Sequence, residues 1–196
     1  DDSFDVRCNT VGRDFEFTEV RVIDPETGEE CPVGVQGEMC NRGYNTMKGY
    51  YKNPEATAQI IDVNGWLHTG DLGVMDEEGY VTVRGRSKNM LLTSSGQNIY
   101  PEEIESKLNN MPYVAESLIV LQHDKLVALI YPDFDDAFAH GLQQNDIQKV
   151  MEVNRAELNQ QLPNYCQISK IKIHFEEFEK TAKKSIKRFM YQEAKG

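Results

Sequence analysis

The chain has 196 residues, 39% of them hydrophobic, and a formal net charge of -11 with a sequence pI near 4.8. This length suffices for one or two modest cores. The negative charge repels nucleic-acid phosphates and anionic lipid surfaces, so we expect no nucleic-acid partner. The four cysteines and four histidines show neither CxxC nor HxxxH spacing, which argues against a structural zinc site and predicts no metal ligands.

The sequence contains no signal peptide and no apolar run near the roughly 18 residues that a membrane span needs. It also lacks a disulfide-like cysteine framework. We therefore expect a cytoplasmic protein without a membrane span and leave peripheral membrane contact open. Because the chain begins at Asp1 without a methionine, we expect it to be a piece of a longer protein.

The first half has the sequence pattern of a β structure. Short runs such as EFTEVRVI (16–23) and GYVTVRG (79–85) are separated by the turn sequences PETG, NPEA, DVNG and DEEG. This pattern predicts three to five strands of a sheet or barrel.

The second half mixes helices with strands. PEEIESKLNNM (101–111) and IQKVMEVNRAELNQQL (147–162) carry apolar residues at helical spacing, and Pro101 with two early glutamates favours a helix start. Apolar runs at 117–121 and 126–131 around the turn QHDK predict a hairpin, and IKIHF (171–175) alternates like a strand. We expect an α+β unit with a short sheet and flanking helices.

Two charged residues in the first half could form a binding site. Asp71 follows Thr69 and Gly70 in the segment GWLHTGDLG, and Arg86 ends the strand predicted fifteen residues later. A short carboxylate can accept two hydrogen bonds from a vicinal diol, as in ribose recognition, and a guanidinium suits sugar and phosphate oxygens. Taken singly, however, the TGD segment also fits a plain turn, and Arg86 also fits a surface ion pair.

The order of motifs resembles the adenylate-forming enzymes, which include acyl-CoA synthetases, luciferases and the adenylation domains of peptide synthetases. The resemblance runs from VGRDFEFTEVRVIDPETGEECPVGVQGEM through NRGYNTMKGYYKNPEAT and GWLHTGDLG to GRSKNMLLTSSGQNIYPEEIE, and ends in KTAKKSIKR. GYYKNPEAT and SSGQNIYPEEIE look most similar to bacterial long-chain fatty acid–CoA ligases.

The resemblance implies a fold and two domains. Residues 1–87 would be the β-rich, barrel-like end of the large adenylation domain, and residues 88–196 the mobile C-terminal lid domain. The family's phosphate loop and acyl pocket would precede Asp1, so the resemblance implies that this piece alone is inactive.

The implied reaction has two steps. A fatty acid carboxylate attacks the α-phosphate of ATP in the presence of Mg²⁺ and gives acyl-adenylate; the thiol of coenzyme A (CoA) then attacks this anhydride and gives acyl-CoA. By resemblance, Asp71 would hold the ribose hydroxyls with Arg86 beside it, and Lys88 would be the hinge of the lid. Gly96 would line the CoA channel, although a glycine needed only for its turn explains this position equally well.

The terminal block departs from the family. Aligned without gaps on Thr181 and Arg188, the family's catalytic lysine falls on Ser185, with Lys183 and Lys184 just before it. We predict that Lys184 acts as the catalytic lysine of adenylation, with Lys183 as the alternative. The basic tail, six cations against Glu193 in residues 180–195, also fits a merely solvated surface.

Two other functions stay open. One is an adenylation domain or CoA ligase for another carboxylic acid, and the other is a non-catalytic binding module that keeps the lid fold. The chain length of the acid is not readable from this sequence, because the acyl pocket would lie upstream.

Overall fold

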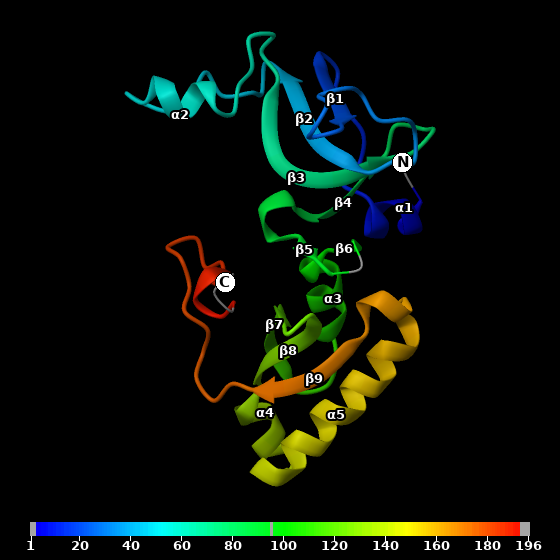
Figure 1. Ribbon diagram of the computed structural model, residues 1–196, viewed down its shortest axis with the longest axis vertical. Coiled ribbons are helices and arrows are strands. Elements are labelled where there is room, and N and C mark those ends of the chain that lie inside the picture. Colours follow the sequence, from blue (N-terminus) through cyan, green and yellow to red (C-terminus); the bar gives the residue numbers. More distant parts are fainter. Residues whose placement is uncertain (1–2, 95, 193–196) are drawn as a thin grey trace. The chain divides into compact units, whose positions relative to one another are not determined.

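The computed structural model describes residues 3–94 and 96–192 (Figure 1). The chain divides between Asn89 and Met90 into two compact units. In the described part of the chain, no helix has the length and apolar character needed to cross a bilayer.

The first unit is built on an antiparallel sheet with the strand order β1-β2-β3-β4. Its elements are α1 (Phe4–Asn9), β1 (Thr18–Ile23), β2 (Gly37–Gly43), α2 (Pro54–Ala58), β3 (Leu67–Met75), β4 (Val81–Arg86) and the 3₁₀ turn η1 (Ser87–Asn89). The strands predicted around 16–23 and 79–85 are confirmed as β1 and β4. The expected barrel-like closure is not found among the described residues. Four strands in this order, with β1 and β4 at the two ends and not paired with each other, are too few to close a barrel.

The core of the first unit is small. The buried apolar residues that pack on one another are Ile23, Cys40 and Trp66. Two guanidinium groups lie over the Trp66 ring, with the Cζ of Arg21 at 4.0 Å and that of Arg42 at 4.6 Å from the ring centroid. Cation–π contacts of this kind extend the packing of a sheet that buries few aliphatic side chains.

The second unit is α+β, as predicted. Its elements are β5 (Leu91–Leu92), β6 (Asn98–Ile99), α3 (Pro101–Leu108), β7 (Val114–Gln122), β8 (Lys125–Pro132), α4 (Phe134–Ala139), α5 (Gln144–Gln161), η2 (Asn164–Cys166), β9 (Ile168–Ile173) and η3 (Arg188–Met190). The predicted hairpin is β7–β8, and its turn residues His123 and Asp124 adopt the positive φ that tight hairpins require. Strand β9 pairs parallel with β8, because the connection through α4 and α5 is long enough for a crossover.

Both predicted helices are confirmed with shifted ends. Helix α3 ends at Leu108, three residues before the predicted Met111, and α5 begins at Gln144, where a capping box joins Gln143 and Asp146. One face of the β7-β8-β9 sheet packs on these helices through a core that includes Ile104, Ile119 and Met151. Figure 1 shows α5 running along this sheet.

The C-terminal segment covers the other face of the same sheet. Phe178 is 2% exposed and packs on the outward side chains of β7 and β8, including Leu118 and Val127. Arg188 then closes the segment onto α3 through a double contact of its two terminal nitrogens with the carboxylate of Glu105. Glu105 also accepts the Ile119 backbone N–H at 2.6 Å, so it joins the segment, α3 and β7.

Removing Arg188 should destabilise the second unit far more than removing a surface cation. In Arg188→Met, the buried Glu105 carboxylate loses its counter-ion, and we expect a loss of roughly 3–5 kcal/mol in the free energy of unfolding. Lys149→Met, which removes an exposed ion pair with Asp146, should cost less than about 1 kcal/mol. Hydrogen exchange of the β7 and β8 amides measures both changes.

Two further measurements test the cause. Burial already raises the pKa of the Glu105 carboxyl, and the Arg188 guanidinium opposes this rise. A raised pKa favours the folded state below that pKa, so the defect of Arg188→Met should shrink as the pH falls and Glu105 takes up a proton. Glu105→Gln combined with Arg188→Met should regain most of the loss. A loss in Arg188→Met no greater than in Lys149→Met would contradict the anchoring role.

Candidate functional site

The segment Thr69–Gly70–Asp71 forms a bulge in β3. Cys40 of β2 faces His68 and Glu38 faces Leu72, so the single residue Met39 lies opposite three residues of β3. The Thr69 hydroxyl closes the bulge on both sides: it donates to the Met39 carbonyl at 2.7 Å and accepts the Asp71 backbone N–H at 3.1 Å. Bulges of this kind re-aim side chains next to active sites.

Gly70 lies at the top of the bulge with φ at +69°, a conformation that residues with a side chain rarely adopt. Its N–H cannot reach a regular strand partner and instead donates to Glu38 Oε1 at 2.9 Å. Its carbonyl accepts the Ser87 hydroxyl at 3.3 Å. The TGD segment therefore does change the direction of the backbone, as its residue types predict. This change lies within strand β3 and not in a free loop.

The bulge brings the two predicted binding residues together. Asp71 and Arg86 face each other in the β3–β4 ladder, and Arg86 Nε lies 2.7 Å from Asp71 Oδ1. Arg86 Nη1 also donates to the Thr69 carbonyl at 3.4 Å. The Asp71 side chain is 28% exposed and that of Arg86 is 50% exposed, so both can reach a ligand.

This pair offers acceptors and donors side by side. A carboxylate has about four lone-pair sites, so one ion pair leaves capacity for a diol. A guanidinium carries five N–H donors in a fixed fork. The arrangement suits a sugar diol next to an anionic group.

A second cluster, Glu38, Cys40 and His68, lies beside the bulge and was not found from the sequence. His68 Nδ1 is 3.0 Å from Glu38 Oε2 and 3.6 Å from Cys40 Sγ. The three residues offer one possible metal-ligand atom each, and these atoms all lie within 4.8 Å of one another. Burial raises the pKa of the Cys40 thiol to about 11, and the negative charge of Glu38 adds to this rise. The cysteine is thus a neutral, fully buried thiol.

The cluster does not fit a magnesium ion. Mg²⁺ requires hard oxygen ligands in octahedral geometry, and this group offers one carboxylate, an imidazole and a thiol. Both carboxylate oxygens of Glu38 already accept hydrogen bonds. The contacts describe a hydrogen-bond network next to the bulge.

The predicted hinge, Lys88, is an exposed residue of η1 and lies two positions before the chain passes into the second unit at Met90. Short 3₁₀ turns are frequent as connectors between elements. Its role as a hinge stays a prediction.

Gly96 lies in a tight turn, and the backbone conformation of this turn is enough to explain a glycine at this position. Its φ is +78°, its N–H donates to the Thr93 carbonyl at 3.0 Å, and Gln97 returns its N–H to the Thr93 hydroxyl at 3.1 Å. Among the described residues, no atom lies within 4 Å of a Cβ placed on Gly96. The turn therefore needs a glycine-like backbone, and the place of Gly96 in a CoA channel stays a prediction.

The predicted catalytic lysine lies in another tight turn. Lys184 donates its backbone N–H to the Thr181 carbonyl at 2.9 Å, and Thr181 donates to the Ser185 carbonyl at 2.8 Å. Lys183, Lys184 and Ser185 are all exposed at the tip of this turn. Lys184 has φ at +62°, a conformation that glycine adopts most readily.

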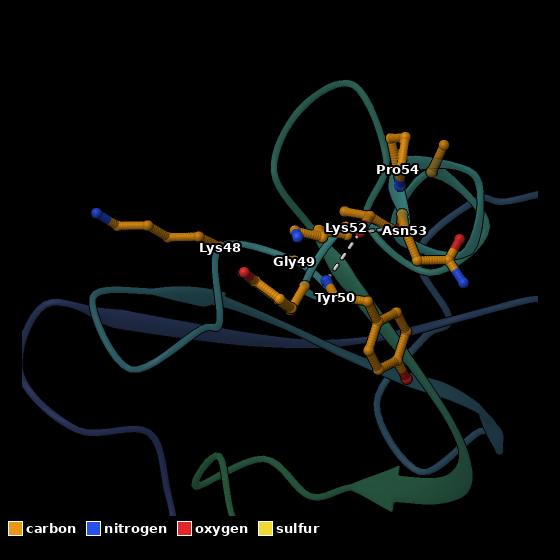
Figure 2. A pocket seen from close by; sticks show the side chains of 9 residues that line it. Lys48, Gly49, Tyr50, Lys52, Asn53 and Pro54 are labelled. Carbon is orange, nitrogen blue, oxygen red and sulfur yellow. Dashed lines mark hydrogen bonds between the residues drawn. The ribbon is translucent and has the colours of Figure 1, made fainter.

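An open pocket lies at the base of α2 and is lined by residues 48–54, 57 and 58 (Figure 2). The Thr57 hydroxyl accepts the Tyr50 N–H at 2.9 Å, and Asn53 caps α2 through Ala56 at 3.0 Å. Figure 2 shows the Lys48 side chain extending away from the pocket. None of the predicted site residues lines it.

Two family models match this chain. The model of the AMP-binding enzyme C-terminal domain matches residues 88–194, and that of the AMP-binding enzyme matches residues 1–51. A solved structure, ATP-bound MatB from Rhodopseudomonas palustris, is 30% identical with a TM-score of 0.69, over 93% of this chain and 35% of that one.

Three relatives in sequence are similar over more than half of the chain. YngI of Bacillus subtilis (strain 168) is 50% identical over 61% of this chain and 22% of its own length. The long-chain-fatty-acid–CoA ligase of Escherichia coli O157:H7 is 45% identical over 57% and 19%. The mitochondrial medium-chain acyl-CoA ligase ACSF2 of Rattus norvegicus is 38% identical over 61% and 19%. The chain thus spans about a fifth of the length of these relatives.

The buried network beside the bulge predicts selective thiol reactivity. At pH 8 a thiol with a pKa near 11 is almost entirely protonated, so Cys40 should react with iodoacetamide at least roughly 100-fold more slowly than an ordinary exposed thiol. Cys8, which is exposed, serves as the internal control. Mass spectrometry of peptides after timed alkylation measures both rates. Comparable labelling of Cys40 and Cys8 in the folded protein would contradict this description of the cluster.

Proposed function

The chain belongs to the AMP-binding enzyme family, and we propose that it is the C-terminal part of an AMP-forming acyl-CoA ligase for long-chain fatty acids. Residues 1–87 are then the end of the large adenylation domain and residues 88–196 the mobile lid. The observation that carries the proposal is the bulge that pairs Asp71 with Arg86 at an accessible position. The long-chain assignment is supported by the Escherichia coli relative, while the rat relative is named for medium-chain acids.

The proposed reaction has two displacements. First, a carboxylate oxygen of the acid attacks the α-phosphate of ATP, the bond to the β-phosphate oxygen breaks, and pyrophosphate leaves. Asp71 accepts hydrogen bonds from the ribose hydroxyls, and Arg86 lies beside the sugar. Magnesium would enter with the phosphates of ATP. The donor cluster beside the bulge does not fit this ion, so we assign no magnesium ligand to the described residues.

In the second displacement, the CoA sulfur attacks the acyl carbon, its proton is lost, and AMP leaves with the bonding electrons. We propose that Lys88 is the hinge about which the lid turns between the two steps, since a hinge needs only a few soft backbone dihedrals. Gly96 lets the thiol arm of CoA pass close to the backbone. The piece of 196 residues alone should be inactive, because ribose contacts without a phosphate loop and acyl pocket do not orient the reactants.

A non-catalytic binding module is the second candidate, and one observation favours it. The position aligned with the family's catalytic lysine is Ser185, which carries no charge to stabilise the developing transition state. The experiment on the lysines below separates this candidate from the ligase.

The first test replaces Asp71 by asparagine in the ligase that contains this chain. The amide keeps the size but loses the charge and one acceptor, so we expect the KM for ATP in ATP–pyrophosphate exchange to rise roughly 10- to 100-fold, the cost of hydrogen bonds to a charged group. Asp14→Asn, an exposed change in the same unit, is the matched control. An unchanged KM for ATP in Asp71→Asn would remove the nucleotide-binding role.

The second test compares Lys184→Ala with Lys183→Ala in the same enzyme. If the Lys184 ammonium stabilises charge on the α-phosphate and carboxylate, its loss should slow adenylate formation by roughly 100- to 1000-fold and leave thioester formation from supplied acyl-adenylate nearly intact. Lys183→Ala should change either step little. The reverse pattern would transfer the role to Lys183, and full activity of both variants would favour a tail without a catalytic lysine.

A further inference from the structure

Glu38 touches the bulge from the neighbouring strand without being one of the groups proposed to meet the nucleotide. Its two carboxylate oxygens have separate partners on β3. Oε1 accepts the Gly70 N–H at 2.9 Å, and Oε2 accepts from His68 Nδ1 at 3.0 Å. Because a carboxylate only accepts hydrogen bonds, His68 Nδ1 must carry the proton in this arrangement.

These two contacts span the bulge. His68 is the last residue in regular register with β2, and Gly70 is the residue whose N–H the bulge takes out of the ladder. An unpaired backbone N–H in a half-buried position costs about as much as a lost hydrogen bond. Glu38 therefore supplies the acceptor that lets three residues of β3 fit opposite one of β2.

The side chain of Glu38 is itself held in place. Its side chain is 15% exposed, Cys40 lies two residues along the same strand, and the Cys40 thiol is 3.6 Å from His68 Nδ1. The other two residues of the bulge are held as well, Thr69 by Met39 and Gly70 by Glu38. The direction of the Asp71 carboxylate thus depends on a group that does not contact it.

We propose that Glu38 is a positioning residue, locked by His68, that holds the Gly70 backbone and so aims Asp71 at the ribose. The effect of Glu38 on the Gly70 backbone is inferred from the geometry of the bulge alone, whereas its effect on ribose binding rests on the proposed function. Glu38 should therefore affect the binding of ATP more than the turnover of bound ATP.

The test uses two variants of Glu38 and one control. Glu38→Gln keeps both contacts, because its carbonyl oxygen can accept from Gly70 and its amide can donate to the other tautomer of His68. Glu38→Ala removes both contacts. Glu19→Ala is the matched control, because Glu19 forms an exposed double ion pair with Arg42 in the same sheet.

The first readout is hydrogen exchange of the Gly70 amide, followed by NMR on the 196-residue chain. In Glu38→Ala the protection of this amide should fall at least roughly tenfold, the loss of one hydrogen bond. In Glu38→Gln the protection of the Gly70 amide should stay within about threefold of that in the parent protein. In Glu19→Ala the protection should equal that in the parent protein. Unchanged protection in Glu38→Ala, or an equal loss in Glu38→Gln and Glu38→Ala, overturns the proposal.

The second readout is ATP–pyrophosphate exchange by the ligase that contains this chain. Glu38→Ala should raise the KM for ATP by at least roughly tenfold with a smaller change in kcat. Glu38→Gln should leave the KM for ATP close to that of the parent enzyme. If Gly70 loses protection in Glu38→Ala but neither Glu38→Ala nor Asp71→Asn changes the KM for ATP, the proposed function fails and the geometric inference stands. If Asp71→Asn raises the KM and Glu38→Ala does not, the positioning role is overturned and the proposed function stands.

Discussion

The mismatch of three residues of β3 against one residue of β2 is the constraint on which the candidate site depends. A regular strand at Thr69–Asp71 would turn successive side chains to opposite faces. The bulge instead breaks the register with β2 while keeping Asp71 opposite Arg86 on β4. The pairing of β3 with β2 thus provides the distortion, and the pairing of β3 with β4 provides the ion pair. The carboxylate and the guanidinium are therefore fixed together before any ligand arrives.

Charge is used differently in the two units. In the first, the pair Asp71–Arg86 is left partly exposed, where it contributes little stability and stays accessible to solvent. In the second, the pair Glu105–Arg188 is largely buried and serves as an anchor for the C-terminal segment. A buried pair is strongly destabilising to break although it is not in itself a large source of stability. The segment that carries Lys183 and Lys184 is thereby held on both sides of its turn, by Phe178 on the sheet before it and by Arg188 on helix α3 after it.

The elements that the sequence predicts are those with a local signal. Helices α3 and α5 follow from apolar spacing, and β7–β8 from two apolar runs around a short polar turn. Residue types and spacing made Asp71 and Arg86 a possible binding site, and the family resemblance gave them a ligand. Glu38 could not be found at all, because its proposed role depends on contacts between β2 and β3, with Glu38 and His68 thirty residues apart in the sequence, and on a bulge that shifts the register. Such register shifts depend on the packing and hydrogen bonding of two strands at once and leave no periodic trace in either strand.

The backbone of Lys184 adds an argument that the sequence alone does not contain. A left-handed conformation costs a residue with a side chain roughly 1–2 kcal/mol, and glycine would avoid this cost. The turn from Thr181 to Ser185 nevertheless places a lysine there, exposed and in the middle of the basic block. Strain of this kind persists where the surrounding structure enforces it or where the side chain is useful. Here both conditions can hold, since Phe178 and Arg188 fix the ends of the segment and Lys184 presents an ammonium group one residue from the position aligned with the family's catalytic lysine. A long side chain can span the displacement of one residue, so the exposed turn agrees with the proposal that Lys184, and not the neutral Ser185, supplies the charge of the adenylation step.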